Sequence, residues 1–242
     1  SGSIDEFRIG EQLARKGEMT IRSTTAFSVK QHTSDSAIAE FIKIKNRTKD
    51  DPLLKGHAVK FLLDGVIEGH SAPLLDPDDA GGSGSTPAAD FAIPLDKYQE
   101  LINRLDKEGF QIYTHAIGDR TVREALNAFE KLPAVNGEKE RRHRLEHIEL
   151  VSPEDAPRFA QLGVLVSMQP IHAEPAEPNT WAQLAGEKRL PNAFAWNTLL
   201  RNNARLVFGS DWPACASTDP IRGIHVAVNR QTPDGYPDGG WV

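Results

Sequence analysis

Four strand-like segments of this sequence carry, in or just after the strand, a side chain of a type that binds metal ions or activates water. They are Lys60, His115, His147 and Asp211, in that order along the chain. If these strands are parallel neighbours, the four side chains lie together, because the carboxyl ends of such strands form one face of the fold. The order Lys, His, His, Asp on successive strands therefore predicts a shared catalytic or metal site.

The chemistry that such a set supports is hydrolysis by a metal-activated water. Neutral imidazole and carboxylate groups are good zinc ligands, and bound zinc brings the pKa of its water toward about 7. Asp211 could accept the proton of that water and pass it to the leaving nitrogen. Lys60 lies in an apolar strand, and burial there lowers an amine pKa. The free amine could then take up CO2 as a carbamate that bridges two cations.

Strand and helix patterns alternate about six times along the chain, which indicates parallel strands with helical crossovers. Neither GxGxxG nor GxxxxGK[ST] occurs, which disfavours nucleotide-binding folds. The pattern predicts a (β/α)8 TIM-type barrel that is incomplete, with about six βα units and two long loops at 66–94 and 170–192. Tyr98, Leu101, Ile102 and Leu105 are expected on the buried face of one helix. Val122, Ala125, Leu126 and Phe129 are expected on that of the next.

Several short sequence motifs resemble those of the metal-dependent amidohydrolase superfamily. They are VKFLLDGVIEG (59–69), HAIGD (115–119), RLEHIEL (144–150), SMQPIHA (167–173) and FGSDWP (208–213). The similarity extends from about residue 17 to the end and is greatest to the branch that contains N-substituted formamide deformylase. It implies that His115 and His147 bind zinc, that Lys60 can be carboxylated and bridge two metals, and that Asp211 binds metal and handles the proton. Residues 1–242 would form a partial barrel domain, without the first strands, their His-x-His pair or an accessory β domain.

Two further residues are predicted to touch substrate. His172 follows Gln169-Pro170 in the second long loop, at the face where the strands end. Trp212 adjoins Asp211. His143 and the Arg141-Arg142-Arg144 run are interpreted as a solvated entrance to the strand that ends at His147.

Residues 143–147 also fit H-x-x-E-H, the inverted zinc-protease motif, which requires a helix. A strand fits this short segment better, and on a strand His143 and His147 would lie about 13 Å apart, too far to share one metal. The protease is therefore the minor alternative. A non-catalytic remnant of the barrel is the other, because the first-strand His pair has no counterpart here.

The predicted function is thus a zinc-dependent hydrolase, with one or two ions, that cleaves a non-peptide C–N amide-type bond in a small molecule. A net charge of −6 argues against nucleic-acid and anionic-membrane partners. The single cysteine, Cys215, excludes an internal disulfide and suits the cytoplasm. The oligomeric state stays open, with a homo-oligomer as one option.

Overall fold

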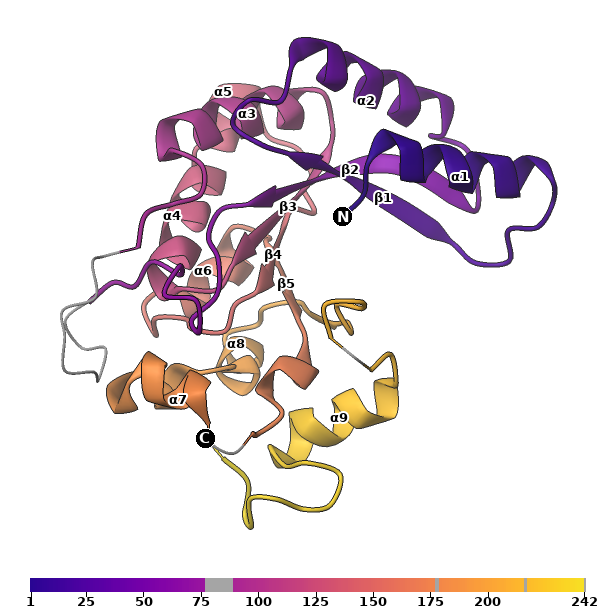
Figure 1. The fold of residues 1–242 in the computed structure, drawn as a ribbon. Helices are drawn as coiled ribbons and strands as arrows, with labels where there is room; N and C mark the ends of the chain where they lie inside the picture. Colours follow the sequence, from indigo (N-terminus) through magenta and orange to yellow (C-terminus); the bar gives the residue numbers. More distant parts are fainter. Residues whose placement is uncertain (77–88, 177–178, 216, 242) are drawn as a thin grey trace.

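The computed structural model describes residues 1–76, 89–176, 179–215 and 217–241. Within them, six parallel strands form one sheet in chain order, which Figure 1 shows as a fan. The predicted α/β class and incomplete barrel are confirmed. The strands are β1 (Ser23–Val29), β2 (Leu54–Leu62), β3 (Gln111–Ala116), β4 (Arg144–His147), β5 (Leu165–Met168) and β6 (Leu206–Phe208).

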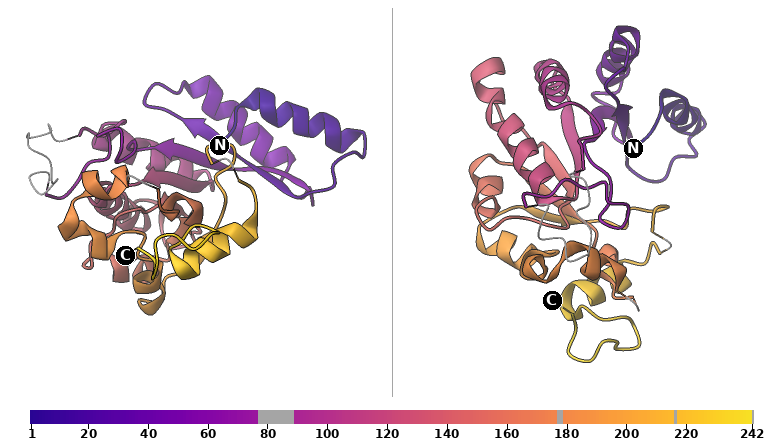
Figure 2. Two further views of the ribbon diagram at one scale, coloured as in Figure 1. Left: turned by 60° about the horizontal axis from the view of Figure 1, so that its bottom comes forward. Right: turned by 60° about the vertical axis from the view of Figure 1, so that its left-hand side comes forward.

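Helices connect the strands and cover the outer side of the sheet. α2 packs on β2, and α3 and α4 pack on β3. In chain order the helices are α1 (Ile4–Arg15), α2 (Asp35–Arg47), α3 (Leu95–Lys107), α4 (Asp119–Glu130), α5 (Leu132–Asn136), α6 (Ala156–Gln161), α7 (Thr180–Ala185), α8 (Trp196–Arg201) and α9 (Pro220–Asn229). Figure 2 shows α1 and α2 at one end of the fan and α9 at the other.

The apolar faces of α3 and α4 are those that the sequence predicts. All eight expected side chains are buried, because a 3.6-residue period places them on one stripe against the sheet. Gly118 precedes α4 at a point where a Cβ would meet the carbonyl oxygen of Pro73 at 2.1 Å. A glycine there lets the chain after β2 pass directly over the start of α4. Two segments near the predicted site are thereby held together.

The strand register sorts the chemistry-bearing side chains into rows on the inner face of the sheet. Lys60 lies beside Tyr113 across the β2–β3 ladder, and Tyr113 lies beside Arg144 across the β3–β4 ladder. The next row toward the carboxyl ends places His115 beside Glu146. Because side chains two residues apart share a face, Lys60 and His115 occupy adjacent rows on neighbouring strands.

The structure also contains elements that the sequence patterns did not predict. α1 and α9 are absent from those predictions, and the loop expected at 170–192 contains α7 and two 3-10 helices, η2 (Pro170–Ala173) and η3 (Glu187–Asn192). Of the two expected loops, 77–88 and 177–178 lie outside the described residues. Gly2 pairs with β1, donating to the Ala26 carbonyl and accepting from the Ser28 amide, so the chain itself covers part of this sheet edge.

The alternative prediction of an inverted zinc-protease motif at residues 143–147 is wrong. Residues Arg144–His147 form strand β4, so the two histidines do not share a helix face. The expectation of a solvated strand entrance is also wrong, because His143 is only 4% exposed. Its Nδ1 accepts from the Ile112 amide, and its Nε2 donates to Asp106 at 3.0 Å. The backbone donor fixes the proton on Nε2 and leaves His143 neutral.

Asp106 is the centre of a buried ionic network at the end of the sheet opposite the predicted site. Its carboxylate is 1% exposed and bonds to Arg141, Asn136 and His143. Burial alone would raise the pKa of Asp106, but the bonds from His143 and Arg141 outweigh it and hold the pKa below its usual range. For His143, burial lowers the pKa. Both groups therefore favour the folded state when unprotonated.

We expect Asp106→Asn to destabilise the fold by about 3–5 kcal/mol, because it leaves buried cationic donors without their anion. The wild-type free energy of unfolding should fall as the pH drops below about 6.5, where unfolded His143 takes up a proton, and again below about 4, where Asp106 does. Urea unfolding between pH 3 and 8 measures both effects. A variant within 1 kcal/mol of wild type would show that the network contributes little.

None of the helices among the described residues is long and apolar enough to cross a membrane.

Candidate metal centre

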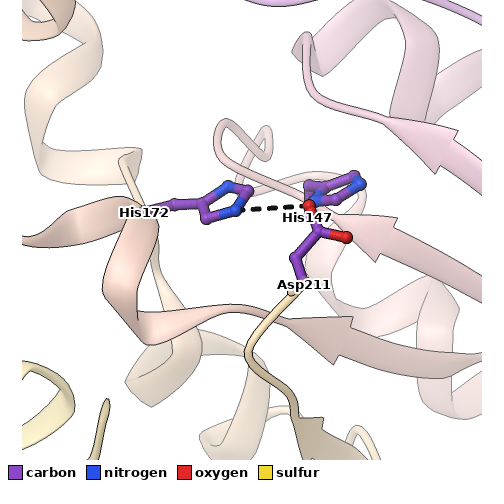
Figure 3. A group of neighbouring side chains, drawn as sticks. All are labelled: His147, His172 and Asp211. Atoms are coloured by element: carbon purple, nitrogen blue, oxygen red, sulfur yellow. Dashed lines mark ion pairs between the residues drawn. The ribbon is translucent and has the colours of Figure 1, made fainter. Parts of the chain in front are cut away.

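Three side chains from separate segments converge beyond the carboxyl ends of the strands. His147 ends β4, His172 lies in η2 after β5, and Asp211 follows β6. One nitrogen of each imidazole and one oxygen of the carboxylate all lie within 4.8 Å of one another. Figure 3 shows the two rings facing each other, with the Asp211 carboxylate beside them. This cluster, His147–His172–Asp211, could hold a metal ion.

His147 is held in a backbone conformation that non-glycine residues rarely adopt. Its φ is +75°, and that of Ile148, a β-branched residue, is +50°. The strain turns the chain at the end of β4 and is typical of functional sites. The Nδ1 atom of His147 is buried without a hydrogen-bond partner. Burial, with the nearby charge of Lys60 acting in the same direction, holds the pKa of His147 well below its usual value, so the ring is neutral.

His172 and Asp211 form an ion pair across the cluster. Nε2 of His172 lies 3.5 Å from Oδ2 of Asp211, and Nδ1 lies 3.0 Å from Oε1 of Glu149. Burial would lower the pKa of His172, but the two carboxylates outweigh it and raise the pKa to about 10. Burial would raise the pKa of Asp211, but His172 and the Lys60 charge bring it below its usual value. A metal bound at Nε2 would therefore displace a proton.

His115 lies against the cluster with one nitrogen anchored. Its ring centroid is 4.4 Å from that of His147. Nε2 donates to the Gly65 carbonyl at 3.0 Å and lies 3.3 Å from Oδ1 of Asp64. Burial lowers the pKa of His115, so the neutral ring carries its proton on Nε2 and its lone pair on Nδ1. Such an anchor on the far nitrogen is typical of metal-bound histidines.

Asp64 in turn is buried at the start of α4, where it accepts hydrogen bonds from the amides of Ile117 and Gly118. Burial raises the pKa of Asp64 to about 7, against the lowering effect of these bonds. The Asp64 carboxylate is therefore engaged with the backbone that leads into α4 and lies near His115.

Lys60 and Asp211 line one polar groove of about 430 Å³ on the inner face of the sheet, with Tyr113, Arg144 and Glu146. Burial lowers the pKa of Lys60 to about 8, although the charges of Glu146 and Asp211 act in the opposite direction. A minor fraction of Lys60, about a tenth at pH 7, is therefore a free amine. Arg144 stacks 3.5 Å over the Tyr113 ring and pairs with Glu146.

The donor set fits a divalent metal. Two imidazoles and a carboxylate resemble the three-ligand arrangement of catalytic zinc sites, which keep a further position for water. The unpartnered Nδ1 of buried His147 is a polar atom that the protein leaves unsatisfied, which is rare unless a group outside the chain completes it. The structure thus brings His115, His147 and Asp211 together with Lys60 nearby, and adds His172.

Two carboxylates at the site, Glu149 and Asp64, were missed because each resembles a solvated acid after a strand. Their positions could have indicated them, because Asp64 lies four residues after Lys60 and Glu149 lies two residues after His147. Trp212, the other predicted substrate contact, has a 64% exposed side chain.

Comparison with known proteins gives consistent matches. The amidohydrolase family model matches residues 1–241. Protein LONG AFTER FAR-RED 3 of Arabidopsis thaliana is 32% identical over 189 residues, which are 76% of this chain and 30% of that protein. The putative amidohydrolase YtcJ of Bacillus subtilis (strain 168) is 32% identical over 183 residues, 75% of this chain and 33% of that protein.

Among solved structures, an uncharacterized metal-dependent hydrolase from Pyrococcus furiosus is 26% identical. It superimposes with a TM-score of 0.72 over 92% of this chain and 43% of that chain. This chain thus spans about a third of the length of the curated relatives it matches. With a family match over nearly all its residues and a strand order that agrees with it, the chain belongs to the amidohydrolase family.

Proposed function

We propose that the protein is a metal-dependent hydrolase that cleaves a non-peptide C–N amide-type bond in a small molecule. One observation carries the proposal. His147, His172 and Asp211, from three consecutive βα segments, place their donor atoms within 4.8 Å of one another at the carboxyl ends of the strands. Family membership supports the same class of reaction, and the Pyrococcus relative is described as metal-dependent.

In this proposal zinc is the metal, as one or two ions, held by His147, His115 and Asp211, with His172 close enough to serve as a further ligand. When bound, such an ion lowers the pKa of a water and polarises the scissile carbonyl. Asp211 accepts the proton of the attacking water and delivers it to the leaving nitrogen. Its lowered pKa keeps the carboxylate ionised at neutral pH, which is the form that a proton acceptor requires. His172 stabilises the Asp211 charge and contacts the substrate.

Lys60 has the properties that carbamate formation requires. Its amine is partly deprotonated near neutral pH, because burial brings its pKa to about 8. A carbamate on Nζ would replace the cation with an anion that has two oxygen donors. We propose that this group bridges the two ions where two are bound. Lys60 lies on the inner row next to that of His115, so a carbamate on its Nζ would lie near the His115 imidazole.

The groove suggests a small polar substrate. It combines cationic Arg144, anionic Glu146 and the Tyr113 ring within about 430 Å³. A molecule with both an amide and a further polar group would find partners for each there. We retain exposed Trp212, beside Asp211, as a proposed contact of the substrate. We further propose that residues 1–242 belong to a single barrel domain and that the protein acts in the cytoplasm, without nucleic-acid or membrane partners.

The test is hydrolysis of a panel of N-acyl and N-formyl amines by the full-length protein, with and without metal. We expect turnover that a chelator abolishes and that Zn²⁺ restores, with about one or two ions per chain by elemental analysis. Turnover that survives complete metal removal would contradict the proposal. Metal binding without hydrolysis of any amide would favour the non-catalytic remnant instead.

A further inference from the structure

Glu149 is a buried acid whose two carboxylate oxygens each have a separate partner at the centre. Oε1 lies 3.0 Å from Nδ1 of His172, and Oε2 accepts from the indole Nε1 of Trp181 at 2.7 Å. The residue is 5% exposed, and its backbone carbonyl accepts from the Phe194 amide at 2.7 Å. Backbone and side chain are therefore both fixed.

Trp181 holds this carboxylate from the side away from the cluster. The indole is 7% exposed and packs against Phe194, with ring centroids 4.9 Å apart, and against Trp241 at 5.9 Å. A rigid, buried donor leaves Glu149 one preferred orientation, because turning the carboxylate would leave a buried N–H without a partner. The orientation in turn directs Oε1 toward the His172 ring.

We propose that Glu149 is a positioning residue that keeps a proton on Nδ1 of His172 and so directs Nε2 of that ring into the His147–His172–Asp211 cluster. An ionised carboxylate only accepts hydrogen bonds, so the nitrogen that faces it must carry the proton. Nε2, 3.5 Å from Asp211, is then the nitrogen that either donates to Asp211 or binds the metal. Only metal binding by Nε2 of His172 rests on the proposed metal-dependent function; the fixed Nδ1 proton does not.

The geometry distinguishes this role from packing alone. The His172 ring lies nearly parallel to that of His147, with an interplanar angle of 11° and a centroid distance of 5.3 Å. A ring held only by stacking could turn over and exchange its two nitrogens. The bond to Glu149 removes that freedom, and carboxylate–histidine pairs of this kind orient metal ligands in other proteins.

The experiment compares Glu149→Gln with Asp155→Asn in the full-length protein. Asp155 is a matched control, since it is 2% exposed and accepts from Arg123 and Arg158 on the outer side of the fold. In E149Q the amide has a single oxygen acceptor, whereas the donors of His172 and Trp181 each need an acceptor. We expect Co²⁺ affinity, measured by visible absorption in competition with a chelator, to fall about 10- to 100-fold. D155N should stay within about twofold of wild type, although both variants lower the melting temperature.

A second measurement detects the proton in the wild-type protein itself, and a variant serves only to assign the signal. Nitrogen-15 NMR of labelled histidines, with His172 assigned through His172→Asn, should show a proton on Nδ1 of His172 both without metal, where the raised pKa keeps both ring nitrogens protonated, and with Zn²⁺, where only Nδ1 keeps its proton. Failure to bind any metal while this proton is present would contradict the proposed function and leave the positioning role supported. An unprotonated Nδ1, or an E149Q variant that binds Co²⁺ as D155N does, would overturn the inference about Glu149.

Discussion

If the full-length protein is the proposed hydrolase, replacing Asp211 by Asn should lower kcat by about 10²-fold or more while leaving part of the metal bound. The amide keeps one oxygen that can act as a ligand, but it cannot accept the proton of the attacking water. The backbone should not change, because Asn tolerates the φ of +55° that Asp211 adopts. Steady-state kinetics on a substrate found in the amide panel, with metal content measured on the same sample, tests this expectation.

Asp219→Asn provides the matched control for that experiment. Asp219 lies in the same segment and caps α9 through a bond to the Ile221 amide, and Asn is an equally good cap. It should therefore keep wild-type kcat and stability. Near-normal turnover in D211N would show that Asp211 is only structural.

Replacing His147 by Asn should abolish the stabilisation that the metal gives to the fold. At a free metal concentration about 1,000 times its Kd, binding to the native state adds about 4 kcal/mol to the free energy of unfolding. The variant should gain almost none of this. Without metal it should be about as stable as wild type, because Asn accepts the positive φ and the buried, unpartnered Nδ1 is removed.

Denaturant unfolding with and without Zn²⁺ measures both quantities. His57→Asn is the control, because His57 on β2 also has a buried Nδ1 without a partner and lies outside the cluster. It should keep the full Zn²⁺-dependent stabilisation. The same stabilisation in H147N would remove His147 from the ligand set.

The sequence was sufficient to predict that these side chains lie near one another, because parallel strands end at a common edge. Lys60, His115, His147 and Asp211 each lie in or just after an apolar strand pattern, so the alternation of strands and helices predicts their proximity; their role as a metal site stays a prediction. The apolar faces of α3 and α4 could also be predicted, because they depend only on the 3.6-residue spacing of apolar side chains within each helix. These features need no knowledge of which distant residues meet.

What was missed depends on tertiary contacts. His143 lies in a basic run that resembles a solvated surface, yet it is buried because Asp106, 37 residues earlier, supplies its partner. Glu149 acquires its role through Trp181, 32 residues later. For α1 a local signal did exist, since Ser3 and Glu6 form a capping box at its start. The helix was overlooked because its apolar stripe is short, with only Phe7 buried.

The most direct test of the metal centre is anomalous diffraction from a crystal of the protein grown with Zn²⁺, measured on both sides of the zinc absorption edge. We expect an anomalous peak about 2.0–2.2 Å from a nitrogen of His147 and an oxygen of Asp211. Zinc bound only at other residues, or a crystal in saturating Zn²⁺ with no peak between His147, His172 and Asp211, would contradict it.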